Sequence, residues 1–205
     1  MGFDLYGKKP IEREFKHQER YNELSSMSYE ERSKKSLNDE YFELTEQYEE
    51  LNHGAYFRNN VWWWRPLWNF VCNTCDDFLT DKDMDFGHSN DNHFINKSKS
   101  LKIAKKLQSF VDDGTVDKVQ KINEKIREES KKKNHELQVK IDELNDKVIK
   151  ETGKELAPID YPNKYKKQWD KLYAQRDWDA SYPFHKDNVV NFIQFCKESG
   201  GFYIC

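Results

Sequence analysis

Hydrophobic residues in this chain recur mostly in steps of three and four. The clearest run predicts one amphipathic helix between a capping Ser-x-x-Glu motif at Ser28 and a closing glycine at Gly54. Its apolar positions are Leu37, Tyr41, Leu44, Tyr48 and Leu51. Similar stripes predict helices over residues 66–79, 98–113, 165–173 and 187–198. Pro66 suits a first helical position, and Ser98 or Ser100 suits a helix cap.

Both ends of the chain are apolar. Residues 3–7 alternate between apolar and polar types and close on Gly7, which predicts a strand, and residues 202–205 predict a second strand. Free tails are usually polar, so we expect the two strands to lie in one sheet. The predicted fold class is therefore α+β, with a small sheet containing the N- and C-terminal strands and packed by helices.

Residues 116–154 have a different composition from the rest. Lysine, glutamate, aspartate and asparagine dominate, and the sparse aliphatic residues fall in two heptad-like sets on either side of the polar stretch 128–134. The pattern fits a charged helical hairpin turning near Lys132 or one long helix, and either would project. We therefore predict one α+β domain from residues 1–115 and 155–205, with a charged helical insertion over 116–154.

The net charge and the hydropathy of the chain limit the classes of binding partner that we expect. The net charge is −3 and the pI about 6.1, so the sequence predicts no long nucleic acid and no anionic membrane as partner. No apolar run approaches the roughly 20 residues that span a bilayer, and we expect a cytoplasmic protein of a bacterial host. The four cysteines are expected to be free thiols.

The stretch from residue 57 to 68 concentrates four of the six tryptophans with two arginines and two asparagines. Tryptophan faces can stack on a planar group, and Arg58 or Arg65 can pair with an anion. The same composition also fits a hydrophobic core, and three consecutive tryptophans cannot all point one way. A buried arginine would need a carboxylate or a bound anion as partner, so the two arginines distinguish core from pocket.

Two further groups of residues have side chains that could bind a metal or take part in catalysis. Residues 81–93 are rich in Asp, Asn and Gly and predict a long loop, in which His88, Asp91 and His93 could bind a metal or His88 could act as a base. The Cys72-x-x-Cys75 spacing is typical of zinc sites and redox motifs, but no second pair of cysteines with this spacing follows it. Neither group matches a known template, so we predict no metal, no cofactor and no catalytic residues, and we favour a binding protein over an enzyme.

Three blocks of the sequence carry a resemblance. They are the start MGFDLYG, the block YFRNNVWWWRPLW at 56–68 and the ending FCKESGGFYIC at 195–205. Together with the Cys-bearing helix and the Asn-Asp loop, they resemble a family of small uncharacterised proteins encoded by bacteriophages and some bacteria. The resemblance covers residues 1–7, 55–111 and 181–205 and implies no particular activity. Some members carry Cys-x-x-Cys zinc-type repeats in the middle, which this chain lacks.

A phage setting favours one kind of binding protein. Small phage proteins with an aromatic, arginine-lined site include sponges that sequester nucleotide signals of host immunity, an analogy at the level of class. We therefore predict a non-enzymatic protein that binds a small anionic or nucleotide-like ligand. The predicted site comprises Arg58, Asn59, Asn60, Trp62, Trp63, Trp64, Arg65, Trp68, Asn90, Asp91 and Asn92. The alternative is a module that holds a host or phage protein through the helical arm 116–152, and a homo-oligomer is also possible.

Overall fold

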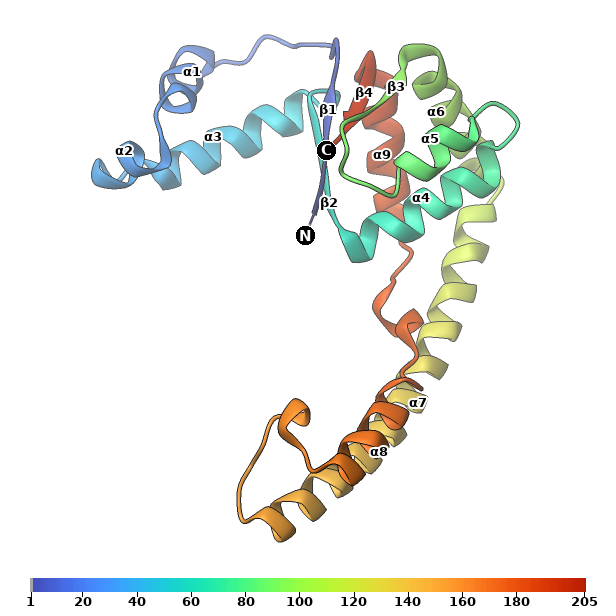
Figure 1. The fold of residues 1–205 in the computed structure, drawn as a ribbon. Coiled ribbons are helices and arrows are strands. Elements are labelled where there is room, and N and C mark those ends of the chain that lie inside the picture. The colour runs from blue at the N-terminus through green and yellow to red at the C-terminus, as the bar shows by residue number, and fades with distance from the viewer. Residues whose placement is uncertain (1) are drawn as a thin grey trace. The chain divides into compact units, whose positions relative to one another are not determined.

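A computed structural model describes residues 2–205 (Figure 1). The chain divides into two compact units, one made of residues 2–117 with His185–Cys205 and the other of Lys118–Phe184. The sequence placed its insertion at 116–154, and the second unit runs on to residue 184. Each unit is described by itself below.

The first unit contains a four-stranded antiparallel sheet. Its strands are β1 (Gly2–Gly7), β2 (Tyr56–Asn60), β3 (His93–Asn96) and β4 (Gly201–Ile204), in the order β2-β1-β4-β3. The terminal strands β1 and β4 pair with Leu5 opposite Ile204, which confirms the predicted α+β fold and the pairing of the two ends. Gly200 and Gly201 have positive φ angles, and they let the chain turn from the last helix into β4.

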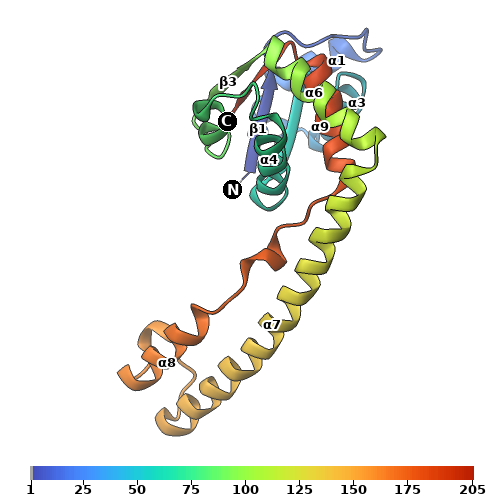
Figure 2. The same cartoon turned by 90° about the vertical axis from the view of Figure 1, so that its right-hand side faces the viewer.

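Three helices cover one side of this sheet (Figure 1). They are α4 (Val61–Cys75), α6 (Lys97–Asp112) and α9 (Lys186–Glu198), and α6 and α9 run side by side (Figure 2). Because side chains alternate along a strand, Phe3, Leu5 and Ile95 all face these helices and are buried. The largest fully buried side chains around them are Trp64, Trp68, Phe192, Phe195, Phe202, Leu67, Ile103 and Leu107. The predicted stripe of α9 is confirmed.

Residues 18–51 form three helices, whereas the sequence predicted a single helix between Ser28 and Gly54 and none before it. These are α1 (Gln18–Ser26), α2 (Tyr29–Lys34) and α3 (Asn38–Leu51). The capping box of Ser28 and Glu31 is present, but it starts only the short helix α2. Ser36 adopts a left-handed φ of 56°, which breaks the helix before Leu37. The apolar stripe of α3 then packs on Phe15 and Leu24 as a small separate core.

Two predicted helix starts and one predicted loop were wrong. Helix α4 begins at Val61, because the side chain of Asn60 accepts from the backbone N–H of Trp62 and Trp63, and Pro66 lies inside the helix. Asn96 caps α6 in place of Ser98 or Ser100. The expected loop 81–93 begins with helix α5 (Asp81–Phe86), which starts at a capping box between Thr80 and Asp83.

The second unit contains most of helix α7 (Thr115–Thr152), then a 3-10 turn η1 (Pro158–Asp160), α8 (Asn163–Tyr173) and a second turn η2 (Trp178–Ser181). Helix α7 is continuous through Lys132, so the long-helix alternative is correct and the hairpin is wrong. Within this polar stretch, the side-chain amide of Asn134 donates to the Asp177 carbonyl at 2.6 Å and accepts from the Asp177 N–H at 2.9 Å. Leu137, Ile141, Leu144 and Val148 are buried on one face of α7.

Candidate functional site

Strand β2 lies at an open edge of the sheet, and half of its main-chain polar groups point outward. Gly7 N–H donates to the Ala55 carbonyl at 3.0 Å, so Ala55, Phe57 and Asn59 bond to β1 in the alternating antiparallel pattern. The N–H and C=O groups of Tyr56 and Arg58 therefore face away from β1. They supply donors and acceptors along the edge.

A groove of about 400 Å³ follows this edge. Trp63 of α4 and three polar residues of α9 form one wall, and Glu49 of α3 contributes to another. The complete lining is Glu49, Tyr56, Phe57, Arg58, Asn59, Trp63, Asp187, Asn188 and Asn191. Three of the predicted site residues, Arg58, Asn59 and Trp63, thus share one concave surface.

A chain of amides fixes the wall between β2 and α9. Asn59 is buried, and its Nδ2 donates to Oδ1 of Asn188 at 3.0 Å. Nδ2 of Asn188 lies 3.3 Å from the carbonyl oxygen of Trp63. The Trp63 ring stacks on His185 with centroids 4.6 Å apart and planes at 15°, yet the residue remains 36% exposed. These contacts hold Trp63 in place while part of its surface stays open to a ligand.

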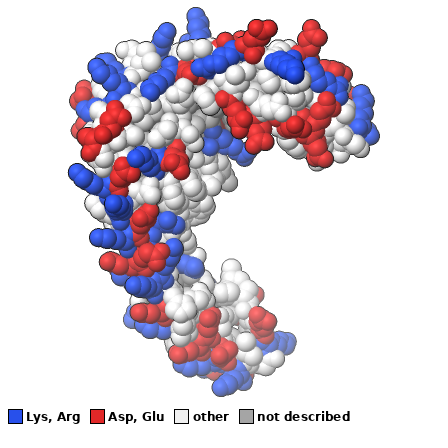
Figure 3. Space-filling model, turned by 180° about the vertical axis from the view of Figure 1, so that it is seen from behind, with Lys and Arg blue, Asp and Glu red and all other residues white. Residues whose placement is uncertain are grey.

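The charges of the groove have both signs. The Arg58 side chain is 69% exposed, with Nε 3.5 Å from Oδ1 of Asp4. Asp4 also accepts a hydrogen bond from the Tyr56 hydroxyl, and burial together with this bond raises the pKa of Tyr56. Burial raises the pKa of Glu49, and the nearby charge of Arg58 opposes that rise. Charges of both signs are also interspersed over the face of the molecule in Figure 3.

Two of the predicted tryptophans belong to the core. Trp64 and Trp68 are fully buried and stack on each other at 5.2 Å. Their indole N–H groups donate to the carbonyls of Gly87 and Met84, at 2.7 and 3.0 Å respectively. The core reading of the tryptophan block is therefore correct for these two residues, while Trp62 and Trp63 are exposed.

The other predicted residues lie near the groove or beyond it. Asn60 is the cap of α4, and Arg65 is exposed on the same helix, where its charge lowers the pKa of His88 after the larger effect of burial. In the 90–92 loop, Asn90 donates to the Gly2 carbonyl at 2.6 Å, and the Arg58 side chain also lies close to Gly2. Asn92 accepts from the Cys205 thiol at 3.3 Å, and Asp91 is exposed. The loop thus approaches Arg58 without lining the groove.

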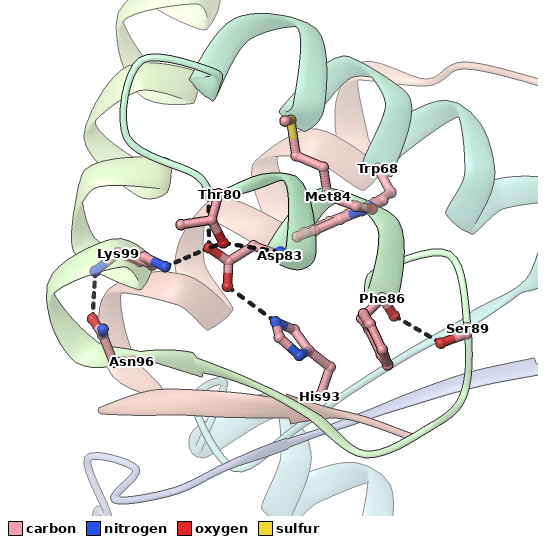
Figure 4. Close-up of polar contacts among 9 residues, drawn as sticks. All are labelled: Trp68, Thr80, Asp83, Met84, Phe86, Ser89, His93, Asn96 and Lys99. Carbon is pink, nitrogen blue, oxygen red and sulfur yellow. Dashed lines mark hydrogen bonds and ion pairs between the residues drawn. The ribbon is translucent and has the colours of Figure 1, made fainter.

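A second polar cluster surrounds the buried carboxylate of Asp83 (Figure 4). His93 Nε2 lies 3.0 Å from one carboxylate oxygen. The other oxygen accepts from the Thr80 hydroxyl at 2.7 Å, from the Thr80 N–H at 2.9 Å and from the Lys99 ammonium group. Burial alone would raise the pKa of Asp83, but the hydrogen bonds from Lys99, Thr80 and His93 outweigh it and hold the pKa well below its ordinary range.

This cluster ties α5 to β3 and α6. Asp83 belongs to α5, His93 to β3 and Lys99 to α6, so one carboxylate joins three elements. His93, considered above as a possible metal ligand, makes this contact through Nε2. Within residues 2–205, no group of three or more His, Cys, Asp or Glu side chains is arranged to hold a metal ion.

The cysteines of α4 are poor nucleophiles at neutral pH. Burial raises the pKa of Cys72 to about 12 and that of Cys75 to about 11. The reactive form of cysteine is the thiolate, so both side chains remain protonated and unreactive. Within the described chain, the groove along β2 is therefore the better candidate for a functional site.

Sequence reasoning missed six residues of the groove: Glu49, Tyr56, Phe57, Asp187, Asn188 and Asn191. Asn188 and Asn191 are three residues apart on α9, so they lie on one helix face beside the buried stripe. That spacing was a usable signal, but only the fold shows that this face meets β2. Comparisons with known protein families, curated proteins and solved structures find no match to this chain. None of the described helices is long and apolar enough to cross a membrane.

Proposed function

We propose that this protein is a non-enzymatic binding protein whose groove along β2 captures a small ligand bearing both a planar and an anionic group. A nucleotide combines these features, and a phage-encoded sponge for a nucleotide signal of host immunity is the biological role we propose for it. The observation that carries the proposal is the meeting of Arg58 and Trp63 with Asn188 and Asn191 in one groove.

Each part of the groove matches one part of such a ligand. The open surface of Trp63 offers stacking to a planar ring, and the exposed guanidinium of Arg58 offers a paired contact to a phosphate. Hydrogen bonds to polar atoms at the edge of the ligand's ring can come from two sources. They are the outward N–H and C=O groups of Tyr56 and Arg58 and the side-chain amide of Asn191. Binding of this kind needs affinity and no catalytic group.

Arg58→Gln is expected to weaken nucleotide binding about tenfold or more, because a hydrogen bond to a charged group contributes roughly 1.5–3 kcal/mol. The measurement is calorimetry of the full chain against a panel of linear and cyclic nucleotides, preceded by a thermal-shift screen. Arg176→Gln, an exposed arginine in the other unit, is the matched control and should bind as the wild type does. If no nucleotide shifts the melting temperature, the proposal is abandoned.

Glu49→Gln tests the same groove, and its expected effect on ligand affinity is opposite to that of Arg58→Gln. The carboxylate of Glu49 borders the groove, and its raised pKa shows that its charge is disfavoured there. Removing that charge should strengthen binding of an anion a few-fold at neutral pH. Weaker binding in Glu49→Gln would indicate a cationic ligand instead.

A specific feature of the second unit supports a second candidate function, capture of a host or phage protein. Tyr173 and Trp178 are exposed, and the guanidinium of Arg176 lies over both rings, 5.8 and 5.6 Å from their centroids. Trp169 stacks on Tyr173 at 4.6 Å. Tryptophan, tyrosine and arginine are the residue types most enriched at the energetic centres of protein interfaces.

Under this second proposal, Trp178→Ala should weaken partner binding about 30-fold, as expected for an interface residue worth at least about 2 kcal/mol. The full chain is immobilised, host lysate is passed over it, and retained proteins are identified by mass spectrometry. Trp62→Ala is the matched control, because Trp62 is similarly exposed in the first unit. A partner held equally by both variants would exclude the aromatic cluster as its contact.

A further inference from the structure

The sheet face opposite α4, α6 and α9 carries a row of four aromatic residues. Tyr6 of β1 lies directly opposite Tyr56 of β2 on one side and Tyr203 of β4 on the other, and Tyr203 lies opposite Phe94 of β3. The row thus crosses every strand, in the order Tyr56, Tyr6, Tyr203, Phe94. Ring centroids are 5.3 Å apart for Tyr6 and Tyr56 and 4.8 Å apart for Phe94 and Tyr203.

The alternation of the strands places this row outside the core. Phe3, Leu5, Ile95, Phe202 and Ile204 point toward the helices, so their sequence neighbours point to the opposite face. Tyr6, at the centre, is 49% exposed. Beside it lies a hollow of about 560 Å³ whose lining includes Tyr6, Tyr56, Arg58 and three tyrosines of α1 and α3, namely Tyr21, Tyr41 and Tyr48.

Positive charge flanks the row at both ends. The Lys8 ammonium group lies 4.4 Å from the centroid of the Phe94 ring, at the β3 end. Arg58 stands beside Tyr56 at the β2 end. Asp4 is a carboxylate on the same face, but it pairs with Arg58 and accepts from the Tyr56 hydroxyl, so its charge is locally offset.

We infer that this aromatic row is a binding platform for a short single-stranded oligonucleotide. Two or three successive bases stack on the rings, and the phosphates between and beside them contact Lys8 and Arg58. Antiparallel sheets with exposed aromatics on their central strands bind single strands in this way, because every base has a face that can stack on a ring. These two cations lie at the ends of the row, which fits a short segment.

The platform shares Tyr56 and Arg58 with the groove along β2, but its other residues are separate, and the inference does not rest on the function proposed for that groove. Trp63, Asn188 and Asn191 line the groove, whereas the row is formed by Tyr6, Tyr203 and Phe94 with Tyr56 at the boundary. Trp63→Ala should therefore leave oligonucleotide binding unchanged, and Tyr6→Ala should leave mononucleotide binding unchanged. Failure of one site is thus separable from failure of the other.

The test is fluorescence anisotropy of labelled oligothymidylate and oligouridylate with the full chain at low salt. Tyr6→Ala and Tyr203→Ala should each weaken binding about tenfold or more, since the loss removes a stacked base. Tyr6→Phe keeps the ring and should bind as the wild type does. Tyr29→Ala, an exposed tyrosine outside the row, is the matched control. If Tyr203→Ala does not fold, half-exposed Tyr6 carries the test alone.

An abasic oligonucleotide of the same length and charge separates stacking from charge attraction, and it should bind at least tenfold more weakly than the base-bearing strand. The preferred strand, thymidylate or uridylate, then distinguishes DNA from RNA. Equal binding of the abasic strand, no binding of either base-bearing strand, or wild-type affinity in Tyr6→Ala would each overturn the inference. So would self-association of the wild type that Tyr6→Ala abolishes, because the row would then be an interface between copies.

Discussion

Asp83→Asn is expected to lower the free energy of unfolding by about 3 kcal/mol, the lower end of the cost of removing one partner from a buried ion pair. Asparagine keeps the shape and can still accept one hydrogen bond from Thr80, so the capping of α5 is partly retained. What it cannot replace is the negative charge that Lys99 and His93 approach. The loss therefore falls on the contact that holds α5 against β3 and α6.

Urea unfolding followed by circular dichroism measures this change. Asp85→Asn is the control, because Asp85 is exposed on the same short helix and should change stability by no more than about 0.5 kcal/mol. Equal stability of the two variants would show that the Asp83 cluster contributes little to the fold.

The effect of Asp83 has a defined pH dependence. Its folded-state pKa is held well below the value of about 3.9 expected for an unfolded chain, so the folded protein binds fewer protons than the unfolded one in acid. The contribution of Asp83 is complete above the unfolded pKa and is lost as pH falls through the folded pKa. The gap in stability between wild type and Asp83→Asn should therefore be constant near neutral pH and shrink below about pH 4.

Local pattern was sufficient to predict those elements that bury one clear face. The stripe of α9 and the apolar ends of the chain depend on burial against a core, and burial is what hydrophobic spacing records. Both predictions are confirmed, with Phe192 and Cys196 buried and β1 paired to β4. The same rule failed for residues 28–54, because Ser36 interrupts the helix through its backbone angle and leaves the apolar spacing intact.

Helix α5 shows a different reason why an element could not be predicted from the sequence. Asp and Asn dominate residues 81–93, and that composition is typical of a loop. The Thr80 and Asp83 pair nevertheless starts a helix, and Asp83 gains further partners, His93 and Lys99, that lie 10 and 16 residues away. A contact of this range cannot be predicted from local spacing, so a buried polar residue that joins three elements was interpreted as part of a long loop.

The groove depends on longer-range contacts still. Arg58, Asn59 and Trp63 stand out in the sequence because they lie in one unusual block. Asn188 lies 129 residues beyond Asn59, yet the two amides meet at 3.0 Å. Only the docking of α9 beside β2 brings them together. The sequence therefore predicted three groove residues of β2 and α4 and could not supply those of α9.

Trp64→Ala is expected to cost about 3–5 kcal/mol of stability, the usual range for removing a large aromatic side chain from a core. Trp64 is fully buried, stacks between Phe3 and Trp68 and meets Phe192 edge-on. The substitution also leaves the Gly87 carbonyl without the indole N–H that now reaches it at 2.7 Å. If Trp64→Ala does not fold, Trp64→Phe keeps one aromatic ring but removes the indole N–H and part of the packing, and it should cost at least about 1–3 kcal/mol.

Trp63→Ala, one residue away, should have the opposite effects: a small loss of stability and a clear loss of nucleotide binding. Trp63 is partly exposed, and the contact that Asn188 makes to it involves a backbone carbonyl that alanine retains. Its loss should lower the unfolding free energy by no more than about 1 kcal/mol while weakening nucleotide binding about tenfold. Thermal melts and calorimetry of the two variants side by side measure this division. If both variants lose only stability, the whole tryptophan block has a structural role. If Trp63→Ala alone loses binding, two adjacent residues of one helix have different roles, Trp64 in the core and Trp63 in contact with the ligand.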